Sequence, residues 1–324
     1  MLISRTPYRC SFSGGGSDYP DWYRDNCGAV IGTTINKYCW LMVRELPPFF
    51  EHKHRIVWSK IELPNSYSEI EHPSVRACLS EFDLPNGMEI HHAGDLPARS
   101  GLGSSSAFTV GLLNALYHMS GVSIAKQQLA LKAIDIEQRV IGESVGSQDQ
   151  VFAAYGGLNY IVFDRNGIEV RSVNITESRL SELQSSLMLF FTGMSRTASE
   201  IAAVQINEIP NKTSELKAMC SLAGMVKYTL EHSKPLSDFG SLLDEEWRLK
   251  KTLSPLISNS RIDEMYEIAT KNGAIGGKIT GAGSGGFLLL FVPEKYQNQV
   301  REKLKDYLWV PFQFEDKGSV ILNG

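Results

Sequence analysis

Alternating hydrophobic and polar residues mark short strands at the two ends of the chain. Residues 5–13, 28–35 and 38–44 alternate in this way, as half-buried strands do. The last two are predicted to form a pair that turns near Asn36 and Lys37. The other predicted strands are residues 88–92, 158–163, 187–192, 287–292, 310–314 and 319–322, with a hairpin turn at residues 164–167.

Apolar residues recur at helical spacing through the middle of the chain. The predicted helices are residues 108–119, 129–141, 198–209, 215–231, 242–253, 261–272 and 294–308. The first is apolar on most sides, which is typical of a buried helix. Proline residues separate the helices of the C-terminal half. The closing order of strand, helix and strand favours an α+β fold.

The length of the chain predicts more than one domain. At roughly 100–200 residues per domain, 324 residues favour two domains over one. We expect the boundary near residue 180, which gives domains of residues 1–180 and 181–324. A chain of this length buries a sizeable core without disulfides or metals.

The composition narrows the class of protein. Hydrophobic residues make up 43% and charged residues 21%, which is ordinary for a globular protein. A net charge of −4 argues against a nucleic-acid partner, because such proteins carry a basic face. The five cysteines are scattered and never form a C-x-x-C pair, so reduced thiols in a cytoplasmic protein are expected. We expect neither a signal peptide nor a membrane span.

A glycine-rich loop that leads into a cluster of serines is the most informative segment. It reads Pro97-Ala-Arg-Ser-Gly-Leu-Gly-Ser-Ser-Ser-Ala107, and the apolar helix begins at its end. Serine hydroxyls at a helix start satisfy free backbone N–H groups, and glycines let a loop turn several N–H groups toward one point. Together with the positive end of the helix dipole, they predict a phosphate cradle. A bare capped helix after a flexible turn is the alternative.

Two other glycine-rich segments lie near the two ends of the chain. Gly14-Gly-Gly-Ser-Asp18 follows the first strand, whose middle carries Arg9. Asp18 is suited either to accept sugar hydroxyls or to bond its own backbone in a turn. The third segment is Gly276-Gly-Lys278-Ile-Thr-Gly281-Ala-Gly283-Ser-Gly-Gly286.

Other short patterns are not expected to carry function. Asp238-Phe-Gly240 matches a kinase magnesium motif but lacks the accompanying kinase motifs. The glycines of residues 281–286 precede a strand instead of following one, so they do not form a dinucleotide fingerprint, and no P-loop is present. His52, His54 and His72 lack metal-like spacing and are expected to be solvated loop residues.

These segments, taken together, resemble three motifs of the GHMP kinase family. The first matches Thr6-Pro-Tyr-Arg9 and Ser13-Gly-Gly-Gly-Ser-Asp18, the second residues 97–107, and the third residues 278–286. Tyr8 stands where galactokinases usually have Gly, and Ser106 where many members have Ala. The resemblance implies a two-domain fold, with an N-terminal domain like domain 2 of ribosomal protein S5 and a ferredoxin-like C-terminal domain.

The resemblance also implies roles for individual residues with ATP and Mg²⁺. Asp149 would be the catalytic carboxylate that accepts or orients the hydroxyl proton, and Arg9 would pair with it; an ordinary buried ion pair is the alternative. Ser105 and Glu137 would hold Mg²⁺. The residues expected to bind ATP are Pro97, Gly101, Leu102, Gly103, Ser104, Ser105 and Ser106. Those expected to bind the sugar phosphate are Gly15, Gly16, Ser17, Asp18, Lys37, Arg196, Lys278, Gly281 and Gly283.

Within the family, residues 12–23, 34–38 and 191–196 look most like the branch that phosphorylates D-glycero-D-manno-heptose 7-phosphate. That branch acts on the anomeric hydroxyl, gives the 1,7-bisphosphate and leads to nucleotide-activated heptose for surface polysaccharide. Two alternatives remain: a GHMP kinase for an unphosphorylated sugar such as fucose, galactose or N-acetylgalactosamine, and a GHMP-fold protein that binds sugar or nucleotide without catalysis. The oligomeric state stays open, and a homodimer is one possibility.

Overall fold

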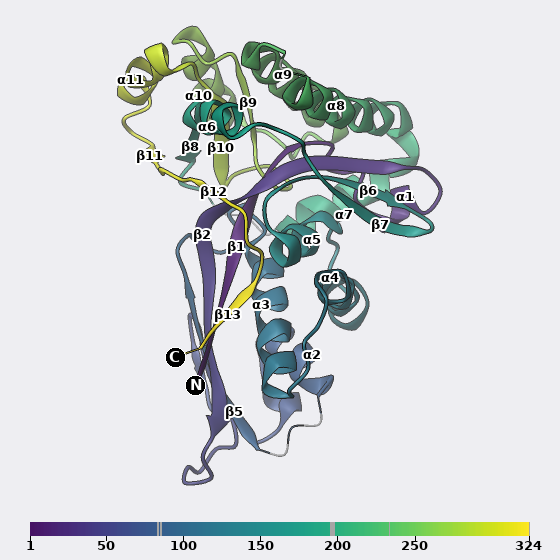
Figure 1. The fold of residues 1–324 in the computed structure, drawn as a ribbon, viewed down its shortest axis with the longest axis vertical. Coiled ribbons are helices and arrows are strands. Elements are labelled where there is room, and N and C mark those ends of the chain that lie inside the picture. The colour runs from purple at the N-terminus through teal and green to yellow at the C-terminus, as the bar shows by residue number, and fades with distance from the viewer. Residues whose placement is uncertain (83, 85, 195–197, 233, 324) are drawn as a thin grey trace.

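The computed structural model describes residues 1–82, 84, 86–194, 198–232 and 234–323, and these form two sheets covered by helices (Figure 1). The strands of the larger sheet are β1 (Leu2–Ser13), β2 (Gly28–Leu46), β3 (Arg55–Val57), β4 (Ile61–Glu62), β5 (Gly87–Gly94), β6 (Leu158–Asp164), β7 (Gly167–Ser172), β12 (Phe314–Glu315) and β13 (Val320–Asn323). Those of the smaller sheet are β8 (Leu187–Phe191), β9 (Gly276–Ile279), β10 (Phe287–Phe291) and β11 (Leu308–Trp309).

The helices are α1 (Pro20–Tyr23), α2 (Pro73–Ser80), α3 (Ser104–Met119), α4 (Lys126–Asp135), α5 (Gln148–Tyr155), α6 (Glu177–Ser185), α7 (Ala198–Glu208), α8 (Thr213–Glu231), α9 (Leu236–Leu253), α10 (Ser260–Lys271) and α11 (Glu294–Lys303). Two groups of consecutive helices, α3 to α5 and α7 to α10, interrupt the strands along the chain. A π-helical turn, Ile136–Ile141, follows α4 directly. None of the helices in the described part of the chain has the length and apolar character needed to cross a membrane.

The larger sheet follows the order β13-β1-β2-β5-β3-β4; β6 and β12 also pair with β2, and β7 pairs with β6. Helices α2 to α5 cover one face of it, as Figure 1 shows. Helix α3 is buried along most of its length, as its apolar sequence predicts, and packs against β1 and β2. The β6–β7 hairpin confirms the turn expected at residues 164–167.

The smaller sheet follows the order β11-β8-β10-β9, and its paired strands are antiparallel. Helices α8 and α9 connect the two parts of the molecule, because α8 packs on β1 and β2 while α9 packs on β9, β10 and β1. Phe12 of β1 meets Phe239 of α9 edge to face, with ring centroids 5.3 Å apart. One cluster of buried apolar residues therefore extends through both parts, and a second cluster lies mainly around the smaller sheet.

The predicted strand pair at residues 28–44 is wrong, because β2 runs without a turn from Gly28 to Leu46. Pro7 of β1 lies opposite Tyr38, and Tyr8 lies opposite Ile35, so Asn36 and Lys37 have no partner on β1. The polar pair is accommodated as a bulge. The backbone N–H of Asn36 instead donates to the carbonyl of Gln313.

The end of the chain returns to the first sheet. Strand β13 pairs with β1, with Leu2 opposite Asn323, and β12 pairs with β2 (Figure 1). Strands from residues 314–323 thus join a sheet whose other strands lie within residues 2–172. The helix predicted over residues 294–308 ends earlier, at Lys303, while α2 and β9 did not appear among the predicted elements.

Candidate active site

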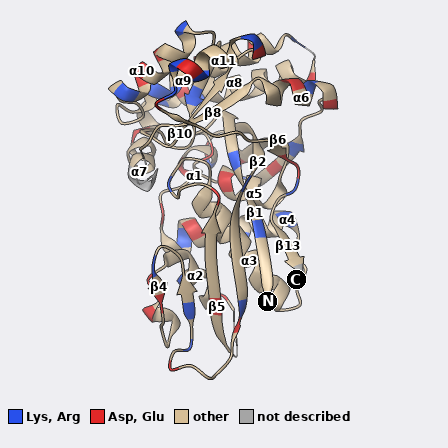
Figure 2. Ribbon diagram, turned by 90° about the vertical axis from the view of Figure 1, so that its left-hand side faces the viewer, with Lys and Arg blue, Asp and Glu red and all other residues tan. Residues whose placement is uncertain are grey.

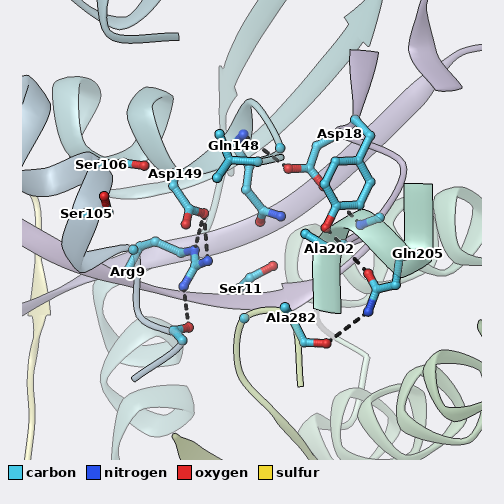
Figure 3. Close-up of a pocket in the computed structure, with 18 of the residues that line it drawn as sticks. Arg9, Ser11, Asp18, Ser105, Ser106, Gln148, Asp149, Ala202, Gln205 and Ala282 are labelled. Carbon is cyan, nitrogen blue, oxygen red and sulfur yellow. Dashed lines mark hydrogen bonds and ion pairs between the residues drawn. The ribbon is translucent and has the colours of Figure 1, made fainter. Parts of the chain in front are cut away.

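A cavity of about 220 Å³ lies where the three glycine-rich segments meet. Its wall combines β1, the loop after it, the start of α3, the start of α5, α7, α9 and the loop after β9. Figure 3 shows Ser105 and Ser106 on one side of Asp149, with Asp18 and Gln205 on the other side. The cavity therefore has a region beside the start of α3 and a second region beside Asp18, and Asp149 lies between them.

Asp149 and Arg9 form the centre of the cavity. The Arg9 guanidinium donates to Oδ1 of Asp149 through Nε at 2.8 Å and pairs with it through Nη2 at 2.6 Å. Nη1 of Arg9 donates to the carbonyl of Gly101 at 2.7 Å. Arg9 is only 4% exposed, whereas the Asp149 side chain is 25% exposed. Both contacts end on Oδ1, so Arg9 leaves Oδ2 of this cavity-lining residue without a partner from its guanidinium.

The serine-rich helix start leaves its backbone donors free. Helix α3 has Gly103 at its N-cap, so no side chain caps it. The serine hydroxyls do not cap the helix as expected; that of Ser106 donates to Glu137 instead, at 2.8 Å. The first N–H groups of a helix have no partner within it. The residues that carry these groups line the cavity at the positive end of the helix dipole, and a helix start placed in this way is suited to bind phosphate.

The second and third glycine-rich loops touch through their backbones. A Cβ atom on Gly281 would lie 2.4 Å from Cα of Gly101, and one on Gly286 would lie 2.2 Å from the carbonyl oxygen of Ser100. Side chains at these positions would push the loops apart. The glycines therefore join a loop of the N-terminal part to a loop of the C-terminal part at the cavity wall.

Asp18 bonds the backbone of its own loop, which is one of the two roles considered from the sequence. Its Oδ1 accepts the N–H of Gly16 at 2.9 Å, as in a turn, and its Oδ2 accepts the N–H of Gln148 at 3.3 Å. The residue also lines the cavity. Burial and the neighbouring Asp149 carboxylate raise the pKa of Asp18. Beside it, the Tyr19 hydroxyl donates to Gln205 at 3.5 Å.

Glu137 is a buried carboxylate with no cationic side chain paired to it in the described residues. It lies in the π-helical turn, a type of irregularity that often occurs at functional sites. Its Oε2 accepts from Ser106 and from Gln150, while Oε1 is buried without a well-formed hydrogen bond. Burial raises the pKa of Glu137 to about 7. A divalent cation would satisfy this carboxylate.

Two lysines support the wall from the C-terminal part. Lys278 of β9 pairs with Glu246 of α9 at 3.2 Å and donates to the carbonyl of Phe12 at 3.0 Å. Glu246 in turn accepts the hydroxyl of Ser13 and the N–H of Gly14. Lys250, one turn further along α9, donates to the carbonyl of Gly281. These bonds hold the first and third glycine-rich loops against α9.

The remaining predicted residues divide into two groups. Gly15, Gly16, Gly101, Gly103 and the serines of residues 104–106 line the cavity, as do Lys278 and Gly281. Five other predicted residues lie outside the lining: Pro97, Leu102, Ser17, Lys37 and Gly283. Leu102 is buried in the core, and the Ser17 hydroxyl donates to the carbonyls of Gly14 and Ala29. Lys37 lies in the β2 bulge, and Gly283 packs against Ile257. Arg196 lies outside the described residues.

Sequence reasoning missed several cavity residues. The sequence patterns did not point to Lys250, Gln205 or Gln148, which line the cavity. They also did not point to Arg99, which has φ +59° and lines the cavity as well. A signal existed for Lys250, because it falls on the apolar face of α9 together with Trp247 and Leu253. A charged residue on the apolar face of a helix indicates either a buried ion pair or a functional site.

Comparison with known proteins agrees with this geometry. The family models for the GHMP kinases N terminal domain and the GHMP kinases C terminal region match residues 72–157 and 225–308. A D-glycero-alpha-D-manno-heptose 7-phosphate kinase of Campylobacter jejuni subsp. jejuni serotype O:2 is 30% identical over 98% of this chain and 97% of its own length. The chain belongs to the GHMP kinase family.

Solved structures of GHMP kinases share the fold. A D-glycero-D-manno-heptose 1-phosphate kinase from Bacteriodes thetaiotaomicron has a TM-score of 0.83 at 25% identity, covering 100% of this chain and 99% of its own. A Lactococcus lactis galactokinase complexed with galactose has a TM-score of 0.76 at 16% identity, covering 98% and 94% of the two chains, and shows the fold alone. The expected α+β GHMP kinase fold is confirmed, and the protein is a kinase that uses ATP.

Proposed function

We propose that this GHMP kinase transfers the γ-phosphoryl group of ATP to the anomeric hydroxyl of D-glycero-D-manno-heptose 7-phosphate, giving the 1,7-bisphosphate. The observation that carries the proposal is the Arg9–Asp149 pair, which lines a cavity between the start of α3 and Asp18 and in which Arg9 binds only Oδ1 of the carboxylate. An acceptor hydroxyl placed there would lie in front of a phosphate bound at the start of α3.

Each part of the cavity has a task in this reaction. The free N–H groups at the start of α3 bind the ATP phosphates. Asp149 orients the acceptor hydroxyl and receives its proton, while Arg9 holds that carboxylate in place and stabilises the charge that develops in transfer. Asp18 accepts hydrogen bonds from sugar hydroxyls. Phosphoryl transfer depends mainly on positioning and charge stabilisation, and this wall provides both.

Glu137 fits a magnesium ion, together with a serine hydroxyl at the start of α3. Ser105 was the expected partner, but in the structure Ser106 bonds directly to Glu137, while Ser105 lines the cavity beside it. Mg²⁺ takes few protein oxygens and completes its shell with phosphates and water. When bound, Mg²⁺ would neutralise part of the charge of the ATP phosphates.

The names of the relatives support a phosphorylated heptose as the acceptor. The Campylobacter jejuni relative is named a heptose 7-phosphate kinase, and the Bacteriodes thetaiotaomicron structure a heptose 1-phosphate kinase. The two names differ in the position of the phosphate, but both describe a heptose that already carries one. We further propose that the product serves the synthesis of nucleotide-activated heptose for surface polysaccharide in the cytoplasm.

The test is ADP release with Mg-ATP, comparing D-glycero-D-manno-heptose 7-phosphate with free heptose, mannose, fucose, galactose and N-acetylgalactosamine. Phosphorus NMR then locates the new phosphate. We expect turnover with the 7-phosphate and a product signal from an anomeric phosphate. Turnover that starts only with an unphosphorylated sugar, or a new phosphate at another carbon, would overturn the proposal.

A kinase for an unphosphorylated sugar is the second candidate. The bifunctional fucokinase/GDP-fucose pyrophosphorylase of Arabidopsis thaliana is 26% identical over 93% of this chain, although the match covers only 31% of that protein. Under this alternative Asp149 and Arg9 keep the same tasks, and fucose is the acceptor that turns over in the assay.

A further inference from the structure

Lys250 is a buried lysine in the wall of the cavity. It is 4% exposed, and its Nζ donates to the carbonyls of Ile279 at 3.0 Å and Gly281 at 2.5 Å. An ammonium group has three donors, so one remains after these two bonds. Since Lys250 lines the cavity, this donor is available to a bound molecule.

Lys250 differs from the other buried cations of the wall in having no carboxylate partner. Arg9 is paired with Asp149, and Lys278 is paired with Glu246. In the described residues no carboxylate oxygen lies within ion-pair distance of Lys250, whose hydrogen bonds go to carbonyls alone. A buried charge without a counter-charge is costly. An anion that enters the cavity would supply the missing partner.

The charges around Lys250 also favour the binding of an anion. Burial is the main cause that lowers its pKa, and the charges of Lys278 and Arg9 lower it further, while Glu246 and Asp18 act in the opposite direction. The ammonium form is therefore stabilised by any added negative charge. A phosphate group would provide two such charges and several acceptor oxygens.

The position of Lys250 indicates whether it would bind a phosphate of ATP or the phosphate of the acceptor sugar. Lys250 binds the loop that follows β9, and this loop continues to Ala282. The Ala282 carbonyl accepts a hydrogen bond from Gln205 at 2.9 Å. Figure 3 places Ala282 and Gln205 on the side of Arg9 and Asp149 that faces away from Ser105 and Ser106. The ATP phosphates belong to the side of the serines. The acceptor sugar belongs to the side of Asp18 and Gln205.

We propose that Lys250 binds the phosphate group that the acceptor sugar already carries, and so selects phosphorylated over unphosphorylated sugars. This inference rests on the proposed function, because it requires a sugar phosphate as acceptor. It replaces Lys37, which lies outside the cavity lining, as the cation for that phosphate. Figure 2 shows both acidic and basic residues on α9, and Lys250 is the one among its lysines and arginines that lines the cavity.

The experiment compares the wild type with Lys250→Met and with Lys251→Met, a control on the same helix. Lys251 pairs with Asp263 and does not line the cavity. For each protein, kcat and KM are measured with heptose 7-phosphate and with free heptose, and KM is measured for ATP. We expect Lys250→Met to raise KM for the 7-phosphate roughly 10- to 100-fold, as for loss of a charged hydrogen bond. KM for ATP and kcat/KM for free heptose should stay within about twofold of wild type, and Lys251→Met should match the wild type.

The outcomes separate the inference from the function on which it rests. If the wild type prefers the 7-phosphate and Lys250→Met keeps that preference, or loses activity equally with both sugars, Lys250 does not bind the acceptor phosphate and the inference is wrong. If the wild type itself prefers free sugars, the proposed function fails and the inference fails with it. Should Lys250→Met not fold, Lys250→Gln retains a donor for the loop carbonyls without the charge, and the same comparison applies.

Discussion

Asp149 is the residue on which the proposed chemistry depends most. It lines the cavity, and Arg9 binds only Oδ1 of its carboxylate. Asp149→Asn removes the proton acceptor and the counter-charge of Arg9 while keeping the size of the side chain. We expect kcat to fall about 10²- to 10⁴-fold, with KM for ATP changed only a few-fold.

Asp238→Asn is the matched control for that measurement. Asp238 is an exposed residue of the Asp-Phe-Gly triplet at the start of α9, and it does not line the cavity. Steady-state kinetics should show no change for this variant. An Asp149→Asn enzyme with near-normal kcat would show that positioning by the loops alone accounts for the rate.

His72 makes the stability of the protein depend on pH. It is not a solvated loop residue, as the sequence suggested; its Nδ1 accepts the N–H of Val75 at the start of α2, and its ring stacks on Phe108. Burial is the main cause that lowers its pKa to about 4, from 6.5. Between these two values the unfolded chain binds a proton that the folded chain does not. Stability therefore falls as pH falls through this range.

The expected loss at this site is about 1–2 kcal/mol between pH 7 and pH 5. Urea unfolding of the wild type and of His72→Asn at both pH values measures it. Asparagine still caps a helix but does not titrate in this range, so the variant should lose less stability on acidification. Equal losses in the two proteins would show that other groups cause the acid sensitivity.

At the scale of single residues, the sequence predicted the glycines and charges of the three motifs better than the support around them. Arg9 and Asp149, which are 140 positions apart, are in direct contact as the family resemblance implied. The contact of Glu137 with Ser106 was not predicted. Two adjacent serines on a helix start point in different directions, and only the packing of the π-helical turn decides which of them meets the carboxylate.

The contact between two loops is the decisive feature at the scale of elements. Gly281 has φ +68°, and a Cβ there would lie 2.4 Å from the Cα of Gly101. Gly281→Ala therefore adds a backbone clash to the cost of a left-handed conformation. We expect the variant to lose well over 2 kcal/mol in unfolding free energy, or to keep its stability by separating the loops and losing most of its activity.

Gly121→Ala separates the cost of the backbone clash from the cost of the left-handed conformation. Gly121 has a nearly identical φ of +73°, with no atom within 4 Å of an added Cβ. This control should lose only about 1–2 kcal/mol, with unchanged kinetics. If both alanine variants behave alike in urea unfolding and in activity, the close approach of the two loops is not needed for the site.

Most elements could be predicted from hydrophobic spacing, and the exceptions share a physical cause. The turn predicted at Asn36 and Lys37 is a bulge in β2, because β1 continues opposite the strand on both sides of it. Strand β9 escaped notice since its Gly276 and Gly277 are typical of loops, yet a Cβ on Gly276 would lie 2.0 Å from a carbonyl of α9. Tertiary contacts decide both cases, and local patterns do not contain them.

At the scale of the whole molecule, the chain is held together by connections between its two ends. Strand β13 pairs with β1, and the Ser319 hydroxyl lies 2.8 Å from that of Thr6. The closing strand–helix–strand order correctly predicted mixed secondary structure, but it did not predict that the last strands join the first sheet. Strand partners so distant along the chain leave no signal in a local pattern.

The buried pair of Lys278 and Glu246 couples the two parts of the molecule across the cavity wall. Both side chains are at most 2% exposed, and Glu246 also binds Ser13 and Gly14 of the N-terminal part. Removing one partner leaves the other charge buried and unpaired, at a cost of about 3–5 kcal/mol, whereas removing both costs less than the sum. Urea unfolding of Glu246→Gln, Lys278→Met and the double variant should therefore give a coupling energy of at least about 1 kcal/mol. Additive losses would mean that the hydrogen bonds to Ser13, Gly14 and Phe12, and not the ion pair, hold the two parts together at the site.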